Sequence, residues 1–108
     1  MIRYQRDADS VVVYLQGEID HCTAEKQRSD IEKLIKTQNI RNLSLDFSQV
    51  TFMDSSGIGM IIGRYKTIKA RGGCVYANGL HPPLERLFYM AGLHRIIMIE
   101  NTERREDA

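Results

Sequence analysis

The sequence has few of the features that mark membrane-spanning, secreted and metal-binding proteins. Its apolar runs are short, and one of the longest, residues 11–15, is far too short to cross a bilayer. Residues 1–7 lack the apolar core of a signal peptide, and the only cysteines are Cys22 and Cys74. Two cysteines make neither a disulfide framework nor a zinc site. We therefore expect a cytoplasmic protein that makes no contact with a membrane.

An excess of one sign of charge is missing as well. The chain has 15 Lys and Arg against 14 Asp and Glu, which gives a formal net charge of +1. Direct binding to nucleic acid requires a strongly basic face, so this balance argues against it. At 108 residues, with 43% hydrophobic and 27% charged residues, the chain has the size and composition of one globular domain over 1–108.

Apolar residues recur at strand-like and then helix-like spacing along the chain, which predicts alternating elements. Strands are expected over residues 2–6, 10–16, 42–48, 74–78 and 95–99, and helices over 23–36, 57–70 and 82–91. Residues 17–20 should break the second strand, and residues 100–108 should form a loose polar tail. This order predicts an α/β fold built from βαβ units around a mostly parallel sheet of four to five strands, with the first strand at an edge.

Residues suited to catalysis are scarce. The three histidines are His21, His81 and His94, and no nucleophile-elbow motif is present to pair one of them with a serine. We therefore expect surface or loop histidines rather than catalytic ones. His21 and Cys22 could ligate a metal, but no second pair stands at metal-ligand spacing. The sequence thus predicts a protein that is not an enzyme and holds no metal.

Glycines after residue 56 invite comparison with dinucleotide-binding loops, but their spacing does not fit. In a Gly-x-Gly-x-x-Gly pattern that starts at Gly57, the third glycine would fall at Ile62. The ribose-binding acid expected about twenty residues later is also missing, since no Asp or Glu lies between Asp54 and Glu85. We therefore expect no bound cofactor.

The predicted helix over 57–70 has an unusual composition. Gly59 and Gly63 share one helix face, although glycine costs up to about 1 kcal/mol relative to alanine inside a helix. They indicate that either the sheet or a partner must approach closely. A run of cations is typical of a solvated face, but no acid occurs from Ser55 through Leu84, so docking of an acidic partner is the alternative. The run is Arg64, Lys66, Lys69 and Arg71.

Asp54, Ser55, Ser56 and Gly57 form the most informative local motif. Asp and Ser are typical N-cap residues, which accept hydrogen bonds from the first backbone N–H groups of a helix. The motif also follows a strand, where open α/β sheets bind ligands, and a serine at a helix N-terminus is a favourable position for a phosphate. Both a purely structural cap and a phosphorylation site fit the residues.

Residues 52–59 (FMDSSGIG) and 63–66 (GRYK) closely resemble the anti-sigma factor antagonists of the STAS domain family. The resemblance is to the branch that antagonises the sporulation anti-sigma F factor. Residues 17–21, 86–93 and 96–97 support it, so it extends from the second predicted strand to the last. It implies an α/β fold in which βα units wind as a superhelix around a mixed, mostly parallel sheet.

The resemblance also implies a phosphorylation switch. In this family the unmodified protein binds an anti-sigma factor, which is also a serine kinase, and thereby releases the sigma factor. The kinase uses ATP to phosphorylate the first serine after the aspartate, here Ser55. The phosphorylated form dissociates, and a metal-dependent serine phosphatase restores the unmodified form. The ATP or ADP and the metal belong to these partners.

The surface expected to contact the kinase combines two strand-end loops, 17–23 and 49–56, because adjacent parallel strands end at the same edge of a sheet. Asp20 is a candidate contact to a basic kinase residue, and a helix-capping or turn role is the alternative. The alternative function is that of a STAS domain serving another partner, such as a stress-response regulator or a nucleotide-binding sensor. The other expected contacts are His21, Thr23, Met53, Asp54, Ser56, Gly57, Ile58 and Gly59.

Overall fold

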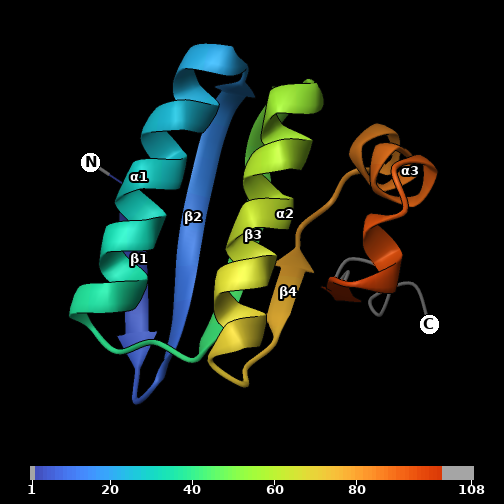
Figure 1. Ribbon diagram of the computed structural model, residues 1–108. Coiled ribbons are helices and arrows are strands. Elements are labelled where there is room, and N and C mark those ends of the chain that lie inside the picture. Colours follow the sequence, from blue (N-terminus) through green and yellow to red (C-terminus); the bar gives the residue numbers. More distant parts are fainter. Residues whose placement is uncertain (1, 101–108) are drawn as a thin grey trace.

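The computed structural model describes residues 2–100, which form one five-stranded sheet with the strand order β1-β2-β3-β4-β5 (Figure 1). β1 pairs antiparallel with β2, and the other neighbouring strands are parallel. The expected mixed, mostly parallel sheet with the first strand at an edge is therefore confirmed. The strands are β1 (Arg3–Asp7), β2 (Ser10–Ile19), β3 (Asn42–Met53), β4 (Val75–Asn78) and β5 (Met98–Glu100).

Helices connect the parallel strands. α1 and α2 lie side by side over one face of the sheet, and α3 lies beyond β4 (Figure 1). A short 3-10 helix, η1, follows α3. The helices are α1 (His21–Thr37), α2 (Ser55–Ala70), α3 (Pro82–Met90) and η1 (Leu93–Arg95).

Alternating apolar residues place the core between the sheet and these helices. In β2 the side chains of Val11, Val13 and Leu15 are buried, as the period of two in a half-buried strand requires. Phe47 of β3 meets Phe88 of α3 edge to face, with ring centroids 5.3 Å apart. Both rings are fully buried, and their contact packs α3 against β3 of the sheet.

Three predicted strand boundaries differ from the structure by three residues or more. β2 does not stop at residue 16, because Gly17, with φ +76°, carries it through a register shift to Ile19. β3 extends five residues beyond Ser48 to Met53, although its buried positions no longer alternate there. The last strand begins at Met98 instead of residue 95, because the chain first forms η1 after the left-handed Gly92. Glu100 belongs to β5, and residues 101–108 of the predicted tail lie outside the described residues.

An ion pair joins α1 to α2. Nε of Arg64 lies 3.1 Å from Oε1 of Glu32, and Nη1 of Arg64 donates to the backbone carbonyl of Arg28 at 3.3 Å. Arg64 is only 7% exposed, and its burial lowers its pKa. Arg71 is engaged as well, because its Nε donates to the carbonyl of Ile40 at 2.8 Å. Arg64 therefore does not belong to the solvated face that the sequence indicated, whereas Arg71, the C-cap of α2, remains half-exposed.

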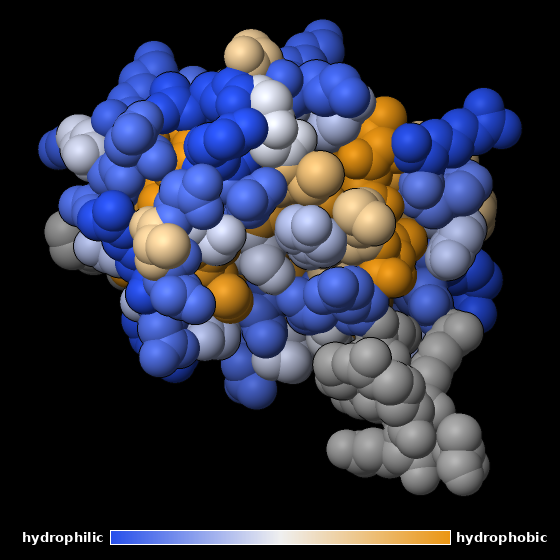
Figure 2. Space-filling model, turned by 90° about the horizontal axis from the view of Figure 1, so that it is seen from below, coloured by the Kyte–Doolittle hydropathy of each residue, from blue (hydrophilic) through white to orange (hydrophobic). Residues whose placement is uncertain are grey.

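The end of the molecule at which α1 and α2 finish is mainly hydrophilic (Figure 2). Apolar residues gather there in a hollow on the side where Figure 1 places α3. The most exposed large apolar side chain of the described residues is Met90 at the end of α3, which is 81% exposed. The polar motif from Asp54 to Gly57 lies at the opposite end, where α2 begins.

Candidate functional site

Two helix N-termini lie next to each other at the carboxyl edge of the sheet. Ile19 of β2 is in register with Met53 of β3, so α1 and α2 begin at the same level. The backbone N–H of Asp54 donates to the carbonyl of Ile19 at 3.1 Å, which ties the two strand ends together. The expected proximity of segments 17–23 and 49–56 is therefore confirmed, although each segment begins as strand and ends in the first turn of a helix.

Asp20 is the N-cap of α1. Its Oδ1 accepts from the backbone N–H groups of Cys22 at 3.1 Å and Thr23 at 3.0 Å. The backbone N–H of Asp20 donates in return to the hydroxyl of Thr23 at 2.8 Å, which completes a capping box. The Thr23 hydroxyl lies 2.9 Å from the carbonyl of Glu18 and donates to it. The capping role of Asp20 is thus confirmed, and its contact with a partner stays a prediction.

These hydrogen bonds favour the ionised form of Asp20. The backbone N–H of Thr23 has the largest effect, the Thr23 side chain adds to it, and together they lower the pKa of the Asp20 carboxyl. Asp20 therefore carries a fixed negative charge at neutral pH, half-buried at the edge of the sheet. This charge is available to a cationic group of a partner while the cap stays formed.

Asp54 caps α2 in a similar position but with fewer bonds. Its Oδ1 accepts from the backbone N–H of Ser56 at 2.8 Å. Ser55 is the first residue of α2 and is exposed, whereas Ser56 is half-buried. Within residues 2–100 the Ser55 hydroxyl makes no hydrogen bond, so no internal base activates it. An external base has access to this hydroxyl.

Gly57 allows the first turn of α2 to pack against the strand ends. A Cβ at this position would lie 2.3 Å from Cγ of Met53 and 3.0 Å from Cγ2 of Ile19. Met53 is 4% exposed and Gly57 is buried. Both residues lie beneath the surface of this chain and support the motif from inside, and their contact with a partner stays a prediction.

The remaining expected contact residues surround Ser55 at different depths. His21 and Thr23 are exposed in the first turn of α1, and Ile58 is half-buried on α2. Gly59 is exposed, and a Cβ there would meet nothing within 4 Å. The same is true of Gly63. Close approach of the sheet therefore explains neither glycine.

Sequence patterns did not reveal two further residues at this edge. Phe52, next to Met53, is 54% exposed, and it is in register with Glu18 of β2. The predicted strand ended at residue 48, so the strand pattern gave no information on this position, which belongs to β3. The ring nitrogen Nε2 of His81, at the start of α3, lies 3.1 Å from the carbonyl of Val50 and fixes α3 against the same edge.

Residues 2–100 contain no group of three or more His, Cys, Asp or Glu side chains that could hold a metal ion. None of the helices described there combines the length and the apolar character that crossing a membrane requires. The site thus consists of an exposed serine hydroxyl, two capping carboxylates and a helix surface without large side chains at Gly59 and Gly63.

Comparison with known proteins agrees with this geometry. The family model of the STAS domain matches residues 1–106. The chain belongs to the STAS domain family. The resemblance drawn from residues 52–59 and 63–66 is therefore confirmed at the level of the family. In this STAS domain Ser55 is exposed to solvent at the carboxyl edge of the sheet, next to the two N-caps.

Similar proteins from other bacteria are named as anti-sigma factor antagonists. The anti-sigma F factor antagonist of Paenibacillus polymyxa is 38% identical over 93 residues, which cover 86% of this chain and 80% of that protein. The anti-sigma-B factor antagonist of Listeria monocytogenes is 36% identical over 99 residues, covering 92% and 86%. Among solved structures, the phosphorylated form of the Bacillus cell fate determinant SpoIIAA aligns with a TM-score of 0.74 and 28% identity over 99% of this chain and 97% of that one.

Proposed function

We propose that this protein is an anti-sigma factor antagonist whose unmodified form binds an anti-sigma factor and so releases a sigma factor. The names of the relatives from Paenibacillus and Listeria support this function. The proposed binding surface, called the Ser55 surface below, lies where α1 and α2 begin. It consists of Asp20, His21, Thr23, Asp54, Ser55, Ser56, Ile58 and Gly59.

Phosphorylation of Ser55 would switch this binding off. The observation that carries the proposal is the exposed Ser55 hydroxyl at the N-terminus of α2, which no described side chain activates. A phosphoacceptor of this kind needs a general base and ATP from the partner, so the anti-sigma factor would be the serine kinase. A serine phosphatase would restore the hydroxyl. The match to a relative solved in a phosphorylated form supports such a modification.

The glycines of α2 support docking along this helix. Gly59 lies one helical turn beyond Ser55, and Gly63 lies one turn further. Glycine is a poor helix former, and at both positions a Cβ would meet nothing within 4 Å, so the packing of this chain does not require a glycine there. A partner that approaches the α2 backbone closely gives a reason for that cost.

In this proposal the chain is a ligand and a substrate, and the catalysts are its partners. We therefore assign it no catalytic residue and no resident cofactor, and the nucleotide and the phosphatase metal stay with the partners. Regulation of a sigma factor also places the proposed function in the cytoplasm, with no direct contact to nucleic acid or membrane.

The decisive experiment treats the purified chain with the anti-sigma F kinase and ATP, followed by mass analysis of peptides. We expect one added phosphate, located on Ser55. The matched variants are Ser55→Ala, which should remain unmodified, and Ser56→Ala, which should be modified like the wild type. Phosphate on Ser56 would contradict the site, and the absence of both binding and modification would contradict the function.

An anti-sigma-B factor is the second candidate partner, because the Listeria relative is nearly as similar as the one from Paenibacillus. Parallel titrations with the two anti-sigma factors would separate the candidates by affinity. Nucleotide binding by this chain in the absence of either factor would instead favour a sensor of the STAS family.

A further inference from the structure

Large apolar side chains are exposed around β5, beside the end of α3 (Figure 1). Of the five large apolar side chains exposed in residues 2–100, three belong to residues 89–98. Tyr89 is 49% exposed, Met90 81% and Met98 54%. Exposed apolar side chains that gather in this way mark interaction sites. A hollow of about 420 Å³ adjoins them, lined by Tyr89, His94, Arg95 and residues 96–99.

The exposed charge of this region is mainly positive. Arg86 and Arg95 are exposed, whereas Glu85, the single acid of residues 82–99, is only 8% exposed. Arg86 stands three residues before Tyr89 on α3, so the two side chains share one face of the helix. In a dimer with twofold symmetry these cations would face each other, and like charges at an interface are unfavourable. The charge therefore favours an acidic partner over a second copy of this chain.

β5 also has the free backbone of an edge strand. Among residues 2–100 the sheet ends at β5, so the outer side of this strand pairs with no other strand there. Native proteins protect such edges with charged residues, and Glu100 is the only charged residue of β5. Beside it the ring of His94 lies against Tyr89, with ring centroids 4.6 Å apart, and both rings line the hollow. A free edge next to a pocket is the arrangement by which a sheet binds an extended peptide.

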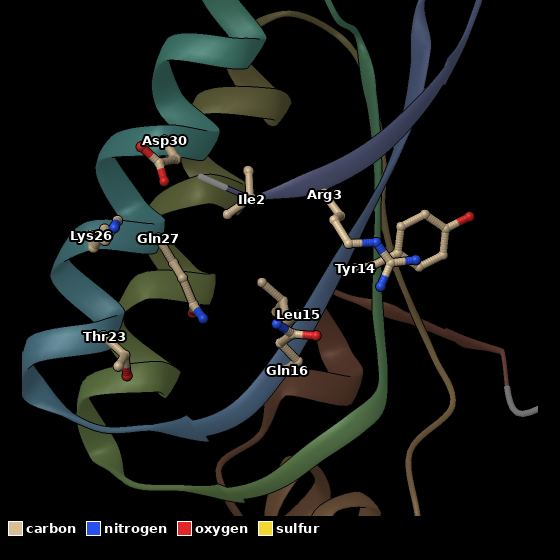
Figure 3. A pocket seen from close by; sticks show the side chains of 9 residues that line it. All are labelled: Ile2, Arg3, Tyr14, Leu15, Gln16, Thr23, Lys26, Gln27 and Asp30. Carbon is tan, nitrogen blue, oxygen red and sulfur yellow. The ribbon is translucent and has the colours of Figure 1, made fainter.

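The pocket between α1 and the β1-β2 hairpin lacks comparable features (Figure 3). Oε1 of Gln27 and Oδ2 of Asp30 have no hydrogen-bond partner in residues 2–100, but both atoms are almost inaccessible. The guanidinium of Arg3 lies 5.1 Å from the centre of the Tyr14 ring, on the sheet face opposite α1 (Figure 3). Neither the unpaired oxygens nor this arginine can therefore select a ligand in that pocket.

We propose that the region around β5, called the β5 patch, binds an extended acidic segment of a partner protein. The segment pairs with β5, an apolar side chain enters the hollow beside Tyr89, and its carboxylates face Arg86 and Arg95. Tyr, Met and Arg are the residue types that protein interfaces favour. This inference is independent of the proposed function, because the patch shares no residue with the Ser55 surface. The β5 patch consists of Arg86, Tyr89, Met90, His94, Arg95 and Met98.

The test titrates the isotope-labelled full chain with a blocked pentapeptide in which aspartate and leucine alternate, and it follows amide NMR shifts. We expect shifts confined to residues 86–100. A peptide with lysine in place of aspartate, and one with serine in place of leucine, should each bind at least fivefold more weakly. Equal binding of the lysine peptide, shifts confined to other residues, or no shifts with millimolar peptide would overturn the proposal.

Two variants test the side chains of the patch. Tyr89→Ser removes one wall of the hollow and Arg95→Glu reverses a charge, so each should weaken binding of the acidic peptide at least fivefold. The matched control is Tyr4→Ser, which removes a tyrosine of similar exposure, 45%, from β1 at the opposite edge of the sheet and should bind like the wild type. Unchanged binding by both patch variants would overturn the proposal.

Sedimentation of the free chain tests the other possible occupant of the patch. We expect a monomer for the wild type and for Met98→Ser. A wild-type dimer that Met98→Ser converts to a monomer would mean that a second copy covers the β5 patch, and it would overturn the proposal.

Discussion

Gly57 and Gly59 stand two residues apart on α2, and the structure predicts opposite effects for the same substitution. Gly57→Ala introduces a Cβ that would lie 2.3 Å from Cγ and 2.7 Å from Sδ of Met53. Gly59→Ala introduces a Cβ with nothing within 4 Å. The first variant should therefore be destabilised and the second should not.

The magnitudes follow from packing and helix propensity. Met53 is 4% exposed and Ile19 is fully buried, so neither has open space into which it can move. Overpacking of this kind costs about 1–3 kcal/mol. Alanine regains less than about 1 kcal/mol in the first turn, so Gly57→Ala should lose roughly 1–2 kcal/mol of unfolding free energy. Gly59→Ala, inside the helix, should gain about 0.5–1 kcal/mol.

Urea and thermal unfolding measure both effects. In a domain of this size 1 kcal/mol shifts the melting temperature by about 4–8 °C, so the two variants should melt on either side of the wild type. Equal stability of Gly57→Ala and the wild type would refute the packing argument. A loss at Gly59 as large as that at Gly57 would refute the claim that Gly59 has no steric role within this chain. Gly59→Leu should then fold normally yet bind the anti-sigma factor at least tenfold more weakly, if the Ser55 surface is the docking site.

Three further predictions address the charged groups. Arg64→Met removes the ion pair with Glu32 and should lower the free energy of unfolding, measured in urea, by about 1–2 kcal/mol. Glu32→Gln introduced into the Arg64→Met variant should cost less stability than Glu32→Gln introduced into the wild type, because the pair is already broken. Asp20→Asn keeps an N-cap and should melt like the wild type, whereas Asp20→Ala should melt lower; if the charge contacts the partner, both lose affinity. The pKa of Asp20 is lowered by folding, so its contribution is complete above about pH 4 and is lost as the pH falls through the folded pKa. The difference in melting temperature between the wild type and Asp20→Ala should therefore close in acid, and a constant difference down to pH 2 would contradict the capping assignment. Phosphorylation of Ser55 should shift the melting temperature by only a few degrees, and a large shift would indicate refolding.

The order of the elements follows from local sequence patterns, and the misjudged boundaries do not. The alternation of Leu43, Leu45 and Phe47 predicts β3 correctly, but its extension to Met53 depends on pairing with β2. Gly17 looks like a break in the sequence because glycine favours turns. In the sheet its positive φ absorbs a register shift and the strand continues, which requires the neighbouring strand to be known.

The candidate site divides in the same way. Exposure of Ser55 and capping by Asp20 and Asp54 follow from residue type and from the position of each residue before a helix. Burial of Met53 beneath Gly57 depends on how α2 seats on two strands, and no local pattern contains that information. Arg64 appears unpaired along the chain because its acid, Glu32, lies on another helix and 32 positions earlier.

The site's electrostatics indicate how one phosphate could control binding without rearranging the domain. A phosphate on Ser55 would bring a charge of about −1.5 to −2 to the N-terminus of α2, where the helix dipole favours it by up to about 2 kcal/mol. The carboxylates of Asp54 and Asp20 stand at the same edge and repel it, so the two effects oppose each other within the domain. A kinase site that still holds a nucleotide offers no such compensation, because its own phosphates carry the same sign of charge. A repulsion of only about 2.7 kcal/mol weakens binding a hundredfold. The proposed switch therefore requires a change of charge on an exposed hydroxyl and a partner that brings negative charge to it, and it requires no change in the fold that positions this hydroxyl.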